Sequence, residues 1–174
     1  MTTQFSTTAF TPNEVPQQTP KTIAFTDLMA SVANLIGAER DLEDVSYSQD
    51  PAYFSWMRDA ELAHERVTDS LRHFHALPND YPQDRPLGRM AQLIDAMLGH
   101  EEPGGARKLH RLMQMSFFTK FQVSGIGATA MHRNAMLIQA RHLTTALAAL
   151  PLFDGSSAPD YGDDPTDDCE FAPF

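Results

Sequence analysis

Apolar residues recur at three- and four-residue steps along most of the chain, and this spacing predicts α-helices. The first predicted helix runs from about residue 27 to 45, with Thr26 or Asp27 as its N-cap. Glu39 continues the apolar stripe of this helix, so a carboxylate is expected to point toward the core. The other members of the stripe are Leu28, Val32, Leu35 and Leu42.

The second and third predicted helices carry similar stripes. Asp50 is expected to cap the second helix and Pro51 to occupy its first position, and this helix extends to about residue 77. Its core-facing positions are Trp56, Ala60, Ala63, Val67, Ser70, Phe74 and Leu77. The third helix is short and ends before Gly99. Its stripe comprises Leu87, Met90, Ile94 and Met97.

The segment from residue 106 to 150 contains no proline, so it could form one long helix or two. The glycines in the sequence SGIG, residues 124–127, weaken the helical preference, and a bend is expected there. His132 is expected to be a core histidine with a hydrogen-bond partner. It falls on an apolar stripe with Met136, Leu143, Leu147 and Leu150.

These stripes together predict an all-α fold, a four- to five-helix antiparallel bundle over residues 25–151. Residues 1–24 are rich in Thr, Gln and Pro and are expected to form a flexible leader. Residues 152–174 contain seven acidic residues and no Lys or Arg. Their composition predicts a disordered acidic tail.

Composition adds the expected setting of the bundle. The chain has 174 residues, of which 42% are hydrophobic, as is ordinary for one soluble domain. No apolar run approaches the roughly 18 residues that a membrane span needs, so no span is expected. Cys169 is the only cysteine, which excludes an internal disulfide and favours a reducing compartment such as the cytoplasm.

Glu61, His64 and Glu65 have the helical spacing that carboxylate-bridged metal sites use in helical bundles. On a helical wheel, however, both glutamates face away from the core stripe. A di-metal bundle needs a second Glu-x-x-His motif in a later helix, but residues 103–168 contain no glutamate. A solvated helix face is therefore the favoured interpretation. Under this interpretation no cofactor is predicted. The alternative is a ferritin-like bundle with a buried metal, cofactor or small-ligand site.

Glu39 needs a partner if it is buried. In an antiparallel hairpin, position 39 lies level with about position 56, so a hydrogen bond to Trp56 or to Tyr53 is expected. The alternative is a ligand-binding or proton-transfer site around Glu39, His64 and His132.

Charge is unevenly distributed along the chain, whose formal net charge is −10. Residues 103–150 contain six basic residues and no acidic residue. Arg107, Lys108 and Arg111 form a basic patch near the start of this segment. Because the whole chain is acidic, the patch suits an acidic protein partner or the chain's own tail better than nucleic acid.

A second apolar stripe follows the predicted core stripe of the same segment. It comprises Met115, Phe118, Ile126, Leu137 and Ile138. Helices with two apolar sides usually have contacts on both. This stripe predicts an interface with a protein partner or with a second copy of the chain, as in a homodimer. Because no catalytic motif is present, the predicted function is that of an interaction or regulatory protein.

Overall fold

The structure is a computed structural model that describes residues 15–45, 53–102 and 104–153. It contains five α-helices: α1 (Pro20–Val45), α2 (Tyr53–Ala76), α3 (Arg85–Leu98), α4 (Gly105–Lys120) and α5 (Ala128–Ala148). It also contains two short 3₁₀-helices: η1 (Pro82–Asp84) and η2 (Pro151–Phe153). No strand occurs in the described residues, so the predicted all-α bundle is confirmed. No helix among them is long and apolar enough to cross a membrane.

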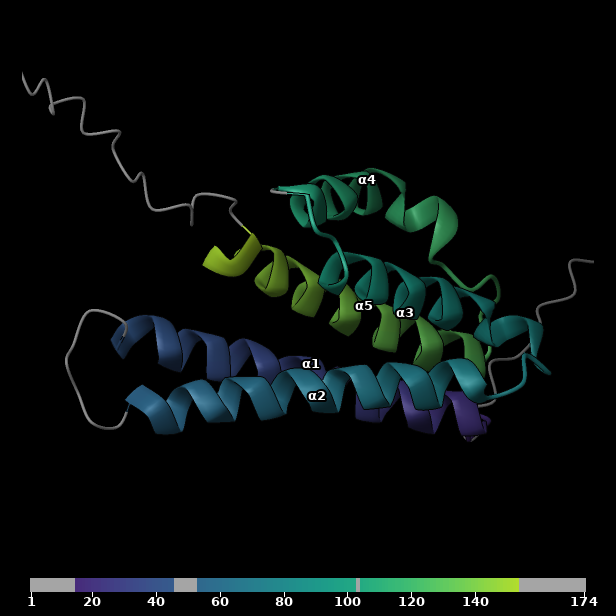
Figure 1. The fold of residues 1–174 in the computed structure, drawn as a ribbon. Coiled ribbons are helices and arrows are strands. Elements are labelled where there is room, and N and C mark those ends of the chain that lie inside the picture. Colours follow the sequence, from purple (N-terminus) through teal and green to yellow (C-terminus); the bar gives the residue numbers. More distant parts are fainter. Residues whose placement is uncertain (1–14, 46–52, 103, 154–174) are drawn as a thin grey trace, which may run out of the picture.

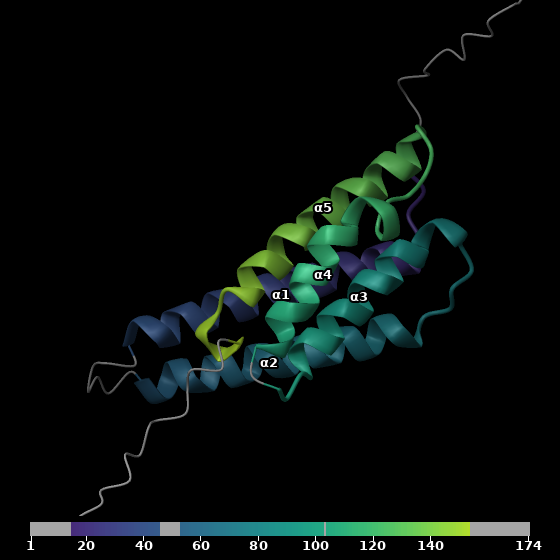
Figure 2. The same ribbon diagram turned by 90° about the horizontal axis from the view of Figure 1, so that it is seen from above.

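The helices lie in three layers (Figure 1). α1 and α2 form a long antiparallel hairpin, and α3 and α5 lie side by side on this hairpin. α4 covers α3 and α5 from the outside, and from above it lies over the line where they meet (Figure 2). α4 therefore has one side packed on the bundle and one side turned outward.

The core is built largely from the predicted stripes. All four stripe residues of α3 are fully buried, as are Leu28, Val32 and Leu35 of α1. Phe74 of α2 packs edge-to-face against Phe25 of α1, with the ring centroids 5.9 Å apart. Several stripe residues are only half-buried: Leu42, Trp56, Ser70 and Leu77. The predicted cap of α2, Asp50–Pro51, lies outside the described residues.

α1 begins at Pro20, and the predicted start near residue 27 is wrong by about two turns. The backbone N–H of Thr19 donates to Thr22 Oγ1 at 2.9 Å, and the N–H of Thr22 donates to Thr19 Oγ1 at 3.2 Å. This reciprocal capping satisfies two donors at the helix terminus. Pro20 occupies the first helical position, where a missing N–H costs nothing.

The segment after residue 103 forms two helices, which decides between the two alternatives, and the expected bend at SGIG is a full break. α4 ends at Lys120 and α5 begins at Ala128. Gly125 has a φ of 120°, a backbone conformation that favours glycine. Asn134 fixes the connection, because its Oδ1 accepts from Val123 N at 2.8 Å and its Nδ2 donates to Val123 O at 3.0 Å.

The predicted boundaries of the bundle change at both ends. Residues 20–24 belong to α1 and not to a flexible leader, because the cap at Thr19 starts the helix before them. Leu152 and Phe153 were assigned to the tail, but they form part of η2, and Phe153 is buried. The rest of the predicted leader before residue 15, and of the predicted tail after residue 153, lies outside the described residues.

A buried ion pair joins α5 to the start of α3. Arg133 Nε donates to Asp84 Oδ1 at 2.7 Å, and neither side chain has more than 1% of its surface exposed. Asp84 Oδ2 accepts from the Thr19 hydroxyl at 2.7 Å. Arg133 Nη1 donates to the backbone oxygen of Gln17 at 3.0 Å. This Arg133–Asp84 network thereby holds the residues before α1 against α5.

Candidate functional site

α4 carries a row of large apolar side chains on its outward side. Leu112, Met115 and Phe118 are 55%, 81% and 66% exposed. Because they follow one another at three-residue steps, they lie along one face of the helix. Met113 and Phe117 are buried in the core. Two sides of α4 are thus apolar, and the described residues of the chain cover only one of them.

The N-terminal half of α4 carries positive charge. Lys108 and Arg111 are exposed, and the half-buried Arg107 donates from Nε to Ala148 O at 3.1 Å, at the end of α5. Residues 103–150 contain no acidic residue, and Glu101 and Glu102 lie just before this segment. A helix N-terminus also favours negative charge nearby. This end of α4 is therefore suited to attract acidic groups.

A groove of about 500 Å³ lies between α4 and α5, beside these bases. Its lining residues are Arg107, His110, Arg111, Gln114, Thr145, Ala148 and Ala149. Two hydrogen bonds fix the polar lining: Arg141 Nε donates to Gln114 Oε1 at 2.6 Å, and Gln114 Nε2 donates to Thr145 Oγ1 at 3.0 Å. The α4–α5 groove is therefore a positively charged surface whose polar side chains are held in place.

His110 belongs to the same set of hydrogen bonds. Gln114 Nε2 lies 2.9 Å from His110 Nε2, and because an amide nitrogen can only donate, the histidine nitrogen accepts. Burial lowers the pKa of His110, and the positive charge of Arg141 lowers it further. His110 is therefore neutral at pH 7, and the positive charge of the groove comes from its arginines.

Known proteins were compared with the chain at three levels. Protein-family models, curated protein sequences and solved structures gave no match. The role of α4 and α5 is therefore inferred from their own exposure, charge and hydrogen bonds.

The predicted second apolar stripe is exposed at four of its five positions. Met115 and Phe118 lie on the outward face of α4, and Ile126 and Ile138 are also exposed. Leu137 is only 1% exposed, so its assignment to an interface is wrong. The buried face of α5 runs through Leu137 and includes Ala130, Arg133, Ala140, Thr144 and Leu147.

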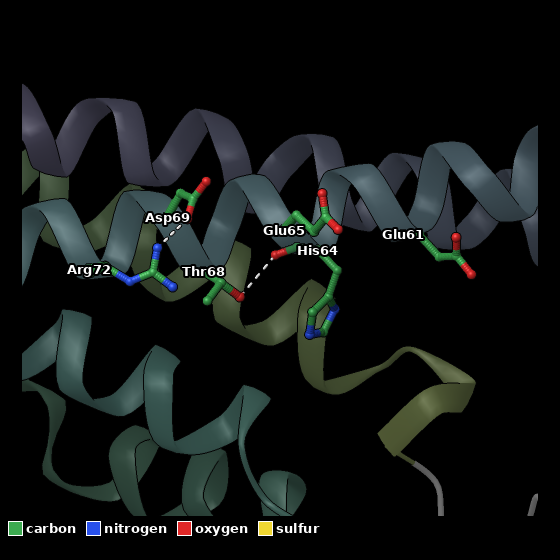
Figure 3. A pocket seen from close by; sticks show the side chains of 6 residues that line it. All are labelled: Glu61, His64, Glu65, Thr68, Asp69 and Arg72. Atoms are coloured by element: carbon green, nitrogen blue, oxygen red, sulfur yellow. Dashed lines mark hydrogen bonds and ion pairs between the residues drawn. The ribbon is translucent and has the colours of Figure 1, made fainter.

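The Glu61, His64 and Glu65 set lies on α2 along an open groove of about 510 Å³ (Figure 3). Both glutamates are exposed, and the His64 ring points away from their carboxylates. Asp69 in the same groove pairs with Arg72. In the described ranges, no group of three or more His, Cys, Asp or Glu side chains is arranged to hold a metal ion. The metal alternative therefore has no ligand cluster in this part of the chain.

Glu39 is half-buried, but its expected partners do not bind it. Neither Trp56 nor Tyr53 forms a hydrogen bond with Glu39 within the described part of the chain. Trp56 lines a groove with Gly37 on a different flank of α1, which explains why the indole does not meet the carboxylate. Burial raises the pKa of Glu39, and the nearby His64 lowers it.

We expect Glu39→Gln to increase the free energy of unfolding at pH 7. Because the folded-state pKa is raised, the folded protein binds the proton more tightly than the unfolded chain does. The free energy of unfolding therefore falls as pH rises through the pKa of Glu39 in the folded protein. At neutral pH the ionised carboxylate destabilises the fold. Urea unfolding of Glu39→Gln and wild type should show a gain at pH 7 that disappears below the ordinary pKa of 4.5.

The matched control for this prediction is Glu61→Gln, which removes the same charge from an exposed position on α2. We expect it to change the free energy of unfolding at pH 7 by no more than about 0.5 kcal/mol. A loss of stability in Glu39→Gln at pH 7 would contradict the prediction and show that the carboxylate is held by a partner.

His132 does not occupy the core position predicted for it. It is half-buried and forms no hydrogen bond among the described residues, whereas its neighbour Arg133 is fully buried. Met136, Leu147 and Leu150 of the predicted stripe are buried, so the prediction is wrong for His132 and not for the stripe as a whole. His64 lines the groove on α2, but Glu39 and His132 are not among the residues that line it.

Proposed function

We propose that the protein acts by binding another protein and that the outward face of α4 is the contact surface. The row of Leu112, Met115 and Phe118 carries this proposal. Soluble proteins seldom leave large apolar side chains gathered on one face, and such patches mark interaction sites. Methionine suits such a surface, because its flexible side chain adapts to the shape of a partner.

The charge around this row indicates the chemistry of the partner. Lys108 and Arg111 are exposed on the same helix, and α4 itself contains no acidic residue. Complementary charge selects partners and speeds their association. The proposed partner is therefore a protein segment that carries acidic residues next to apolar ones. A reducing compartment such as the cytoplasm is the proposed location, because the chain has a single cysteine.

A second copy of the chain fits this face less well. A two-fold dimer through α4 would place the same patch against itself. Because α4 contains basic but no acidic residues, Lys108 and Arg111 would meet no carboxylate on the α4 of the other copy, and the like charges of the two helices repel. An acidic partner removes this repulsion and replaces it with attraction.

The proposal predicts that Met115→Ser combined with Phe118→Ser abolishes most partner binding without unfolding the protein. Both side chains are mainly exposed, so we expect stability to fall by no more than about 1 kcal/mol, including the contact of Phe118 with Arg141. Partner affinity should fall at least about tenfold, which corresponds to about 1.4 kcal/mol. The test is affinity capture from a lysate of the native host, followed by calorimetry of the purified pair.

The matched control is Ile23→Ser combined with Phe54→Ser, which removes exposed apolar side chains from α1 and α2. This control should retain the partner at wild-type affinity. Equal retention by both double variants would contradict a role for α4. Analytical ultracentrifugation tests the alternative of a second copy. If wild type is a dimer and Met115→Ser with Phe118→Ser is a monomer, a second copy occupies this face and the proposal of an acidic partner is wrong.

A further inference from the structure

The described chain ends beside the basic half of α4. Phe153, the last described residue, lines a small cavity together with Gly104 at the start of α4 and with Glu101 and Glu102 just before it. Ala148 and Ala149, a few residues earlier, line the α4–α5 groove. The described chain therefore ends near the first turn of α4, a few residues after the groove that Arg107 and Arg111 line.

The sequence after Phe153 is complementary to this surface. Residues 154–174 contain seven acidic residues and no Lys or Arg. The acids are Asp154, Asp160, Asp163, Asp164, Asp167, Asp168 and Glu170. Ten extended residues span at most about 33–36 Å, whereas the 16 residues of α4 span about 24 Å. The acidic segment is therefore long enough to reach every base on α4.

We infer that residues 154–170 dock on the α4–α5 groove of their own chain, with their carboxylates toward Lys108 and Arg111. Each exposed charge pair is weak and is screened by salt. Attachment to the same chain compensates for this weakness, because it gives the segment an effective concentration in the millimolar range. This docking does not depend on the proposed function. If α4 also binds an acidic partner, the segment would compete with that partner, and only this consequence rests on the proposed function.

Cys169 allows a direct test in the full-length protein, because it is the only cysteine and lies within the acidic segment. A nitroxide attached to Cys169 broadens the amide NMR signals of residues that come close to it. At low salt, we expect broadening at residues 105–114 and 145–149, and little at α2. The broadening should be lost at 1 M salt, where the Debye length is only about 3 Å.

Two double variants separate local contact from overall charge. Lys108→Glu with Arg111→Glu should abolish the broadening at α4. Arg40→Glu with Arg58→Glu changes the net charge equally at exposed positions of α1 and α2, and should preserve it. Uniform or absent broadening in wild type, or broadening that survives Lys108→Glu with Arg111→Glu, would overturn the inference.

A mixing experiment identifies which chain supplies the segment. Isotope-labelled protein without nitroxide is mixed with unlabelled protein that carries the nitroxide. Docking within one chain predicts no broadening at α4 in this mixture, whereas broadening there would overturn the inference in favour of docking between copies. The proposed function is tested by a different experiment, the loss of partner binding in Met115→Ser with Phe118→Ser. Either proposal can therefore be contradicted while the other stands.

Discussion

Replacement of Asp84 by alanine is expected to lower the free energy of unfolding by about 3–5 kcal/mol. The guanidinium of Arg133 has no exposed surface, and this variant would remove the carboxylate 2.7 Å from its Nε. The Thr19 hydroxyl would lose its acceptor as well. A buried charge without a counter-charge is far more costly than the intact pair. Urea unfolding followed by far-UV circular dichroism measures the loss.

Asp69→Ala is the control for this prediction, because Asp69 also pairs with an arginine but is exposed on α2. Exposed pairs contribute about 0–1 kcal/mol, so this variant should change stability little. Asp84→Leu combined with Arg133→Met should recover most of the loss, since it leaves no charge in the core. Arg133 Nη2 is already buried with no hydrogen-bond partner among the described residues, which favours this recovery. Equal effects of Asp84→Ala and Asp69→Ala would contradict a buried pair.

Phe74→Ala should lower the free energy of unfolding by about 3–5 kcal/mol through the cavity it creates. The ring is fully buried and packs edge-to-face on Phe25. Lys21 Nζ lies 4.9 Å from the ring centroid, so a cation–π contact would also be lost. Chemical unfolding of the variant and wild type under identical conditions provides the measurement.

Phe54→Ala is the matched control, because Phe54 lies on the same helix and is 73% exposed. We expect its stability to stay within about 0.5 kcal/mol of wild type. Phe74→Leu should fall between the two, since leucine fills part of the cavity. A similar loss in Phe54→Ala and Phe74→Ala would show that α2 packs on the bundle through a different face.

The helices that the sequence predicted best are those whose core face contains only apolar residues. Leu87, Met90, Ile94 and Met97 of α3 are all fully buried, as their spacing predicted. The 3.6-residue period is easily recognised in such a helix, because residue type and burial agree at every position. The break between α4 and α5 was predictable for a similar reason, since glycine weakens a helix locally.

The features that the sequence did not reveal depend on contacts between distant segments. The sequence gives no sign that Arg133 is buried, because an arginine is rarely buried without a partner. Its partner, Asp84, lies 49 residues away along the chain, and only the fold brings the two together. Leu137 was misplaced because α5 has apolar residues on several sides, so composition alone does not identify its inward face.

The site itself was predicted in part. The bases Arg107, Lys108 and Arg111 and the apolar residues Met115 and Phe118 were all recognised from the sequence. That both sets lie on one helix also follows from the sequence. The outward position of that helix does not, because it depends on how α3 and α5 pack beneath α4. Gln114 and Thr145 in the α4–α5 groove carried no signal, since neither residue type is unusual on an exposed helix.

The Arg133–Asp84 network also constrains the order in which the chain can fold during synthesis. Thr19 binds a residue made 65 positions later, and Gln17 binds one made 116 positions later. At about 5–20 residues per second, the ribosome needs roughly 6–23 s to add those 116 residues. The hairpin of α1 and α2 can form well before that time. Gln17 and Thr19, although made before all five helices, are therefore expected to reach their final positions among the last.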